Sequence, residues 1–234
     1  MTSEKMIETQ NEYEKRIIAF ADILGWRNAI KDSECESLKD IVTSIEDYAN
    51  KFSPQLKDII EGTDGICSTL VKEYSGIEFS FFSDSFVVSA PIDYAKNVFK
   101  ILAFANDILL RKKLLVRGSV TIGDLCHRQR RIFGPALVEA VEMEENEVMY
   151  PRFLCSDKLV AHLDNKGYKD EVVLEDFPQS WVVNIACGSP IACDELMAIV
   201  RSELALDKSE RIMRKWRYTQ EMLPIMYKSR SIIN

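Results

Sequence analysis

Apolar residues follow two periods along the chain, one typical of strands and one typical of helices. RIIAFADIL (16–24), IEFSFFSDSFVVSA (77–90) and LLVRGSVTIG (114–123) are dense in β-branched and aromatic residues, which favours buried strands. The middle run has polar Ser83-Asp84 at its centre, which predicts a hairpin. Residues 36–60 and 94–112 place apolar side chains three and four positions apart, which predicts helices.

Predicted helices and strands continue to alternate in the second half of the chain. Pro135 suits a first helical position and predicts a helix over residues 136–146. YPRFLCS (150–156) predicts another strand, and a further helix and strand follow. The polar run HRQRR (127–131) is predicted to be a loop with His127 exposed. The whole order predicts an α+β protein with a ferredoxin-like βαββαβ core, an antiparallel sheet with helices on one face.

The last part of the chain has a different character. From residue 200 it becomes helical in pattern and strongly charged, as in DKSERIMRKWRYTQEMLPIMYKSR. We predict a main domain over residues 1–199 and a C-terminal helical extension over residues 200–234. The extension is either an appendage of the domain or an arm that joins two copies.

Composition narrows the class of protein. A 47% hydrophobic content over 234 residues suits one domain with a full core. The net charge of −7 argues against a broad nucleic-acid-binding face. The chain has no membrane-spanning apolar run and its N-terminal residues lack a signal core, so we expect a cytoplasmic protein without membrane partners. Its six cysteines form no CxxC pair, which argues against zinc and disulfides.

Two acids occupy the ends of predicted neighbouring strands: Asp22 in FADILGW and Asp84 in FSDSF. Alone, Asp22 could cap the next helix and Asp84 could be a favourable hairpin residue. Together, in this order of elements, they favour a site for divalent cations, because neighbouring carboxylates repel unless a cation lies between them. The turn Ile23-Leu24-Gly25-Trp26 leads into a helix, so its backbone amides could receive a triphosphate.

These motifs resemble a known family. FADILGW, FSDSF, RGSVTIG and FGPALVEA are similar to the class III nucleotidyl cyclase domain over residues 16–163. The string RGSVTIGDL…H…IFGPALVEAVEME…YPR most resembles the pyrimidine cyclases of bacterial Pycsar anti-phage systems. The resemblance implies cyclisation of UTP or CTP to a 3′,5′-cyclic nucleotide with release of pyrophosphate. The product would act on a separately encoded effector that harms the infected cell.

The resemblance also implies a site. It predicts a head-to-tail homodimer with active sites at the interface and two Mn²⁺ or Mg²⁺ ions in each. Asp22, Asp84 and the main-chain carbonyl of Ile23 match the family's metal ligands. The turn from Ile23 through Leu24 and Gly25 to Trp26 would bind the substrate, with the Trp26 side chain as a packing anchor.

The chain departs from the purine cyclases at two places. Their adenine-reading lysine and aspartate correspond to Ser80 and Arg131. Arginine offers only hydrogen-bond donors, which favours the two carbonyls of uracil over cytosine. Their transition-state asparagine and arginine correspond to Val138 and Glu142, so Arg117 or Arg131 is predicted to supply the positive charge instead.

Three alternatives remain open at the level of sequence. The chain could make cyclic CMP by the same chemistry. It could be a cyclase-like sensor without turnover, although a sensor has no need of both Asp22 and Asp84. It could be a palm-type polymerase or dinucleotide cyclase, although FSDSF lacks the GGDEF-like hairpin expected there.

Overall fold

The order of elements follows the alternation of the apolar pattern. The computed structural model describes residues 13–52, 76–128 and 131–229. Its first elements are β1 (Glu14–Leu24), α1 (Trp26–Asp32), α2 (Cys35–Asn50), β2 (Glu78–Phe82), β3 (Ser85–Pro91), η1 (Ile92–Tyr94), α5 (Ala95–Arg111) and β4 (Leu115–Arg128). They are followed by β5 (Arg131–Phe133), α6 (Pro135–Glu147), β6 (Phe153–Cys155), α7 (Asp157–Asn165), α8 (Lys169–Val172), β7 (Val173–Phe177), β8 (Ser180–Val183), η2 (Ile185–Gly188), α9 (Cys193–Leu204) and α10 (Glu210–Lys228).

The strand order defines the fold. The sheet runs β2-β3-β1-β4-β6-β8-β7, with β5 paired to β4. β1 is antiparallel to both of its neighbours, β3 and β4, and β2 is antiparallel to β3. The first four strands therefore have the βαββαβ order of the ferredoxin-like fold, which confirms the predicted fold class and the central position of β1.

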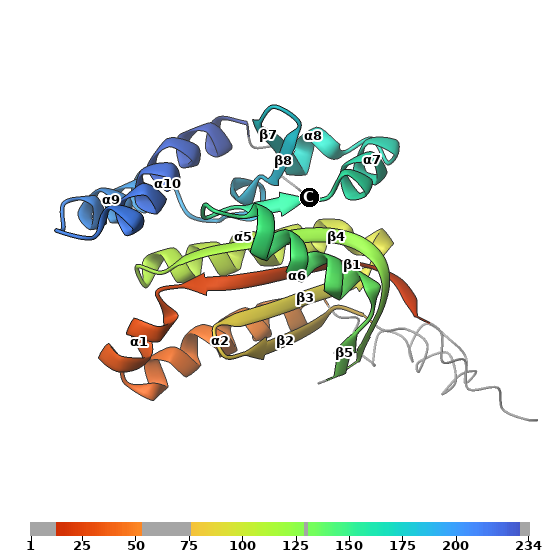
Figure 1. The fold of residues 1–234 in the computed structure, drawn as a ribbon, viewed down its shortest axis with the longest axis horizontal. Helices are drawn as coiled ribbons and strands as arrows, with labels where there is room; N and C mark the ends of the chain where they lie inside the picture. The colour runs from red at the N-terminus through yellow and green to blue at the C-terminus, as the bar shows by residue number, and fades with distance from the viewer. Residues whose placement is uncertain (1–12, 53–75, 129–130, 230–234) are drawn as a thin grey trace, which may run out of the picture.

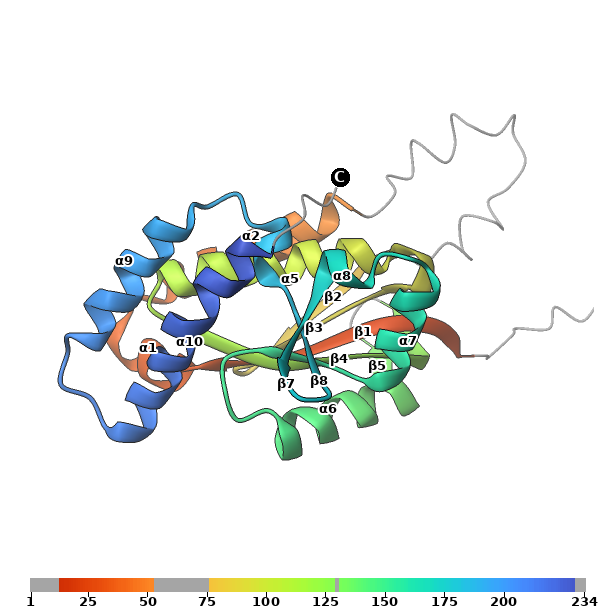
Figure 2. The same cartoon turned by 90° about the horizontal axis from the view of Figure 1, so that it is seen from above.

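Both faces of β1 are buried, and for this reason its sequence reads as one continuous apolar run. Ile17 and Ala19 belong to the main core, which contains side chains of α2 and α5. Ile18 and Phe20, one residue out of phase, pack in a smaller cluster with Ala136 of α6. Figure 2 shows α2 and α5 on one side of the sheet and α6 on the other. Successive strand side chains point to opposite faces, so alternate residues of β1 serve the two layers.

The sheet differs from the prediction in two respects. It is mixed rather than antiparallel, because β6 pairs with β4 in parallel, with Gly118 opposite Phe153. Helices cover both faces rather than one, because α6 lies opposite α2 and α5. The side-chain pattern of a strand buried on both faces contains no signal for strand direction or for which helix covers which face, and this explains both errors.

Several element bounds also differ. The strand predicted over residues 150–156 is limited to Phe153–Cys155. The loop predicted over HRQRR is wrong for His127, Arg128 and Arg131, since β4 continues to Arg128 and Arg131 begins β5, with the two arginines paired. Residues 129 and 130 of that run lie outside the described residues. The helix predicted to reach residue 60 contains α2, which ends at Asn50, and its predicted end lies outside the described residues.

The C-terminal helices pack on the domain at one end of the sheet. Trp216 of α10 is buried with Leu115 of β4 and Val200 of α9. Figures 1 and 2 both place α9 and α10 at the end of the sheet where α1 lies, and β5 at the opposite end. The boundary at residue 199 stays a prediction, and α9 spans it. None of the helices in the described ranges combines the length and apolar character needed to cross a bilayer.

Candidate active site

Asp22 and Asp84 lie together at the α1 end of the sheet. Asp22 pairs with Ser85 in the β1–β3 register, and Asp84 occupies the β2–β3 turn immediately before that residue. The Ile23 amide donates a 2.7 Å hydrogen bond to the Asp84 carbonyl. The two acid side chains keep 22% and 27% of their surface exposed. Antiparallel pairing thus brings together two carboxylates that are 62 positions apart in the sequence.

Arg117 is the principal cation beside this pair. It is opposite Asp22 in the β1–β4 register, and its Nε lies 3.3 Å from Asp22 Oδ2 and 2.8 Å from Glu144 Oε1. Its Nη1 donates a 2.7 Å hydrogen bond to the Val148 carbonyl. These contacts from α6 and the residue after it hold the guanidinium against Asp22.

Glu144 is a neighbour of the site that the sequence did not indicate. Its side chain is only 5% exposed, although it belongs to a strongly acidic helix end. Burial raises the pKa of Glu144, while Arg117 acts in the opposite direction.

The two aspartates differ in their cationic partners. Asp84 has a weaker partner than Asp22, the exposed Arg27, at 3.7 Å. Because Arg117 contacts two carboxylates, its position depends on both β1 and α6.

The turn after β1 has the shape that its glycine permits. Gly25 has φ of +94°, a conformation that side-chain-bearing residues rarely adopt, and its carbonyl accepts from the amides of Asn28 and Ala29. Trp26 begins α1 and is 4% exposed, with its ring 5.5 Å from that of Phe81. The Trp26 side chain is therefore a packing anchor, as predicted. The amides at the start of α1 have no intrahelical acceptor.

The donor atoms at the acid pair suit a hard divalent cation. Asp22, Asp84 and the Ile23 carbonyl offer only oxygen, the ligand type that Mg²⁺ and Mn²⁺ prefer. No group of three or more histidine, cysteine, aspartate or glutamate side chains in residues 13–52, 76–128 and 131–229 could hold a metal ion. Two carboxylates nevertheless fit Mg²⁺, because this ion is usually bound by one or two carboxylates plus substrate phosphates.

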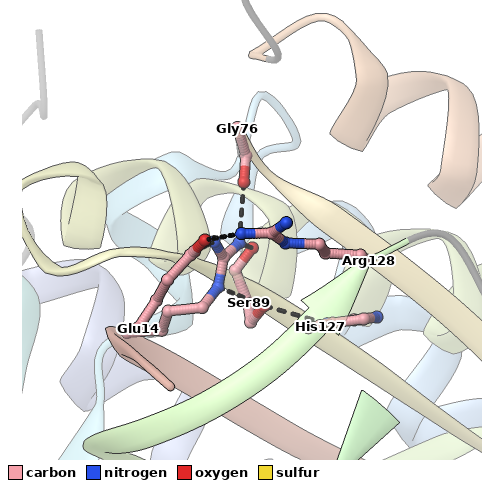
Figure 3. Close-up of polar contacts among 6 residues, drawn as sticks. Glu14, Gly76, Ser89, His127 and Arg128 are labelled. Atoms are coloured by element: carbon pink, nitrogen blue, oxygen red, sulfur yellow. Dashed lines mark hydrogen bonds and ion pairs between the residues drawn. The ribbon is translucent and has the colours of Figure 1, made fainter. Parts of the chain in front are cut away.

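Ser80, which the sequence resemblance predicts to be at a base-reading position, is part of a largely buried polar chain. Its Oγ lies 2.9 Å from His127 Nε2, and His127 Nδ1 lies 2.9 Å from Ser89 Oγ. Ser89 in turn accepts a 3.0 Å hydrogen bond from Arg16 Nε. Figure 3 shows the contact between Ser89 and His127 in this chain and, beside it, Glu14 hydrogen-bonded to Arg128. Ser80 is thus oriented by a histidine on β4, two strands beyond its neighbour β3.

His127 corrects a prediction. It was expected to be exposed on a loop, but it lies on β4 and is 1% exposed. Residues Cys126–Arg128 continue β4, and the His127 side chain faces the serines of β2 and β3 rather than water, whereas Arg128 is exposed. A buried imidazole is stable here because both ring nitrogens have hydroxyl partners.

This burial predicts a pH-dependent stability. Burial, assisted by Arg16, lowers the pKa of His127 to about 4. In the unfolded chain the His127 imidazole would bind a proton near pH 6.5, whereas in the folded chain it stays neutral down to about pH 4. The folded state therefore has its full stability above pH 6.5 and loses part of it as the pH falls toward 4. We expect His127 to reduce the free energy of unfolding by about 2 kcal/mol between pH 7 and pH 5. Urea titrations of wild type and His127→Gln at both pH values measure it; equal pH slopes would contradict it.

Arg131 does not lie near the acid pair of its own chain. It is exposed and opposite Arg128, which is eleven positions after Arg117 on β4. That separation is roughly 36 Å of extended strand. Arg117 and Arg131, both predicted to supply positive charge, therefore lie at opposite ends of the sheet. Val138, predicted to replace the asparagine of purine cyclases, is on α6 and 57% exposed, and Glu142 is on the same helix.

The sequence also gave no reason to connect the C-terminal helix with this site. Lys215 of α10 interacts electrostatically with Arg117, Asp22 and Glu144. The spacing of Arg211, Arg214 and Lys215 shows one basic helix face. The position of that face beside Arg117 depends on tertiary packing, which the sequence pattern does not contain.

Comparisons with known proteins give a distant likeness. No model of a known protein family and no curated protein matches the chain. Similar solved structures include a guanylyl cyclase domain of the fungus Blastocladiella emersonii, at 13% identity and TM-score 0.44 over 74% of this chain and 95% of that one. A bacterial light-regulated adenylyl cyclase has 11% identity and TM-score 0.45 over 82% and 98%. At this distance neither carries an argument about activity.

Proposed function

We propose that the chain is a pyrimidine nucleotide cyclase that converts UTP to 3′,5′-cyclic UMP and pyrophosphate. The observation that carries this proposal is the placement of Asp22 and Asp84 at one end of a ferredoxin-like sheet, Asp22 on β1 and Asp84 in the turn that leads into the adjacent β3. The FADILGW, FSDSF and FGPALVEA motifs support the same class of enzyme. In the reaction, the ribose 3′-oxygen bonds to the α-phosphorus, the bond to the pyrophosphate leaving group breaks, and the 3′-hydroxyl loses its proton.

The acid pair would bind two divalent cations together with the substrate phosphates. Asp22, Asp84 and the Ile23 carbonyl are the proposed ligands, and Mn²⁺ or Mg²⁺ suits these oxygens. When bound, such ions neutralise phosphate charge and lower the pKa of a coordinated hydroxyl. The protein itself contributes a fixed geometry, because Asp22 is on β1 and Asp84 is in the β2–β3 turn, whose backbone is hydrogen-bonded to Ile23 of β1.

Arg117 is proposed to act on the phosphates from the same chain. It is already held by Glu144 and the Val148 carbonyl, so little reorientation is required when substrate binds. A guanidinium can donate two parallel hydrogen bonds to a phosphate, which makes arginine well suited to this task. The proposed role of Arg117 is charge stabilisation of the triphosphate.

Arg131 is proposed to act in the active site that contains the acid pair of a second chain. Its position at the opposite end of the sheet excludes contact with the Asp22 of its own chain. A head-to-tail homodimer would bring the two ends together and complete each active site from both chains. The exposed Val138 on α6 and the 45% exposed Phe82, which packs on Phe20 at the α6 side, supply apolar surface for such a contact.

The base preference is the finer part of the proposal. Ser80 and Arg131 occupy the positions where purine cyclases recognise adenine. Arg131 has only donors and favours the two carbonyls of uracil, whereas cytosine has one carbonyl and an amine. A hydroxyl such as Ser80 can donate or accept, so it leaves cyclic CMP as the alternative product.

A competition experiment tests this preference. The purified chain receives equal concentrations of UTP, CTP, ATP and GTP with Mn²⁺, and the consumption of each is followed by chromatography. We expect UTP to be consumed first. Preferential loss of CTP would correct the base assignment, and preferential loss of ATP or GTP would contradict the assignment to pyrimidine cyclases.

The biological role is proposed from the motif resemblance alone. Cyclic UMP would act as a second messenger on a separately encoded effector during phage infection. The proposal predicts that cells carrying the chain and its neighbouring genes accumulate cyclic UMP after infection, as measured by mass spectrometry of cell extracts. Unchanged cyclic nucleotide levels in cells that resist phage would contradict this role.

A further inference from the structure

A pocket next to Arg117 is lined by cations of the C-terminal helix. Its volume is about 350 Å³. Its lining residues are Arg117, Met149, Tyr150, Arg211, Arg214 and Lys215. Four of these six are cations and none is acidic, although the chain as a whole has a net charge of −7. A local positive pocket on an acidic protein indicates an anionic ligand.

The helix that supplies these cations is firmly attached. Trp216 and Tyr218 of α10 are 2% and 8% exposed. The Tyr218 ring stacks on Tyr150 with centroids 4.9 Å apart, and its hydroxyl donates a 2.8 Å hydrogen bond to Asp176. Further along α10, Asn184 donates to the Met226 carbonyl at 3.1 Å. The backbone of α10 is therefore fixed relative to β7 and to the residue that follows β8, and the basic face is held in place before any ligand binds.

The three cations that α10 contributes to the pocket are poorly compensated, whereas Arg117 is paired with Asp22 and Glu144. Within the described residues, neither Arg211 nor Lys215 forms an ion pair, and Arg214 reaches Glu210 only at 3.5 Å. Burial and the repulsion of Arg117 and Arg211 lower the pKa of Lys215. An anion in the pocket would relieve that repulsion. Arginine in particular suits phosphate, because its planar donors match two phosphate oxygens.

The pocket is continuous with the acid pair through one residue. Arg117 lines the pocket and also contacts Asp22 at 3.3 Å. Leu24, in the turn after Asp22, packs on the cluster that contains Trp216. A ligand that contacts both places needs negative charge at the pocket and groups that can share a divalent cation with the acid pair. A nucleoside triphosphate has this chemistry in its β- and γ-phosphates.

We propose that α10 binds the terminal phosphates of the nucleoside triphosphate through Arg211, Arg214 and Lys215, in the same chain as Asp22 and beside Arg117. This inference rests on the proposed function for the identity of the ligand. It gives the C-terminal helix a role in the active site. It also places the leaving pyrophosphate at the α10 end of the sheet, where the helix would retain it until release.

Binding measurements on the full chain test this assignment without requiring turnover. Isothermal titration calorimetry compares inorganic tripolyphosphate and 3′-deoxyUTP, which lacks the hydroxyl needed for cyclisation, in wild type and in the double variant Arg211→Gln/Arg214→Gln. We expect both ligands to bind at least about 10-fold more weakly to the variant, because each lost contact is a charge-assisted hydrogen bond. Both arginines are exposed, so folding should be unaffected.

Arg217→Gln is the matched control. Arg217 is on the same helix and pairs with Glu210 at 2.8 Å, but it does not line the pocket. If this variant binds both ligands with wild-type affinity, the weakening in the double variant is due to the pocket residues and not to the loss of positive charge on α10 in general. Equal weakening in Arg217→Gln and the double variant would overturn the proposal, as would unchanged 3′-deoxyUTP affinity in the double variant.

The same measurements distinguish this inference from the proposed function. If the double variant loses tripolyphosphate affinity but the wild type forms no cyclic nucleotide, the pocket is supported and the proposed activity fails. If the wild type forms cyclic UMP but the double variant binds 3′-deoxyUTP normally, the activity is supported and the role of α10 fails. If only tripolyphosphate binding is lost, the pocket takes a free polyphosphate, which contradicts its assignment to substrate.

Discussion

Replacing Asp84 by asparagine is expected to lower nucleotide turnover at least ~10³-fold while the chain stays folded. Asparagine has the same shape but no charge, so the pair of proposed metal ligands loses one of its two carboxylates. Stabilisation of transition-state charge by a divalent ion contributes several kcal/mol, and each 1.36 kcal/mol is a factor of ten in rate. Initial rates with UTP and Mn²⁺ measure the effect.

Asp84 is a sharper target than Asp22, because Asp22 also compensates Arg117. Asp124→Asn provides the control: Asp124 lies on β4 of the same sheet and pairs with the exposed Lys15. It should retain full activity. An Asp84→Asn variant with more than a tenth of the wild-type rate would exclude the acid pair as the site of metal binding.

Mixing two inactive variants is expected to restore activity. Asp84→Asn and Arg131→Ala remove residues that lie at opposite ends of one chain, which the proposed head-to-tail dimer brings together from different chains. In a mixed dimer, one site carries both changes and the other carries neither. After subunit exchange of equal amounts, about one quarter of the wild-type rate should return, because half of the dimers have one intact site.

This prediction requires both parents to be inactive and the mixed dimer to form. Differently tagged chains, purified in tandem, establish the second condition. A purified mixed dimer without activity would show that the acids and Arg131 do not act in the same shared site. An Arg131→Ala chain that is fully active by itself would remove Arg131 from the site.

The sequence predicted the elements that bury regular apolar patterns. The first strand, the hairpin around Asp84, the helix over residues 95–111 and the fourth strand all appear in the expected order. Because this order has few compact arrangements, the proximity of Asp22 and Asp84 followed from it. The register that places Asp22 opposite Ser85 agrees with that expectation.

The errors have a common physical cause. Whether a polar side chain is buried or exposed depends on its hydrogen-bond and ion-pair partners. Partners that are distant in the sequence cannot be recognised from a local pattern. His127 was read as a loop residue because its hydroxyl partners come from β2 and β3. Glu144 was not singled out at all, because its partner in the interior, Arg117, is distant from it in the sequence.

The functional role proposed for the C-terminal helix could not be predicted from the sequence for the same reason. Its basic face was visible as a spacing, but its position beside Arg117 results from the burial of Trp216 and Tyr218 against two other parts of the fold. The proposed phosphate pocket is therefore a property of tertiary packing. Its individual residues carry no motif that would indicate it.

The most direct test of the central claim is identification of the product formed from UTP. The purified chain is incubated with UTP and Mn²⁺, and cyclic UMP and pyrophosphate are quantified by mass spectrometry, with Asp84→Asn as the blank. We expect the two products in equal amounts and neither of them in the blank. UMP without a cyclic product, or cyclic UMP formed equally by Asp84→Asn, would contradict it.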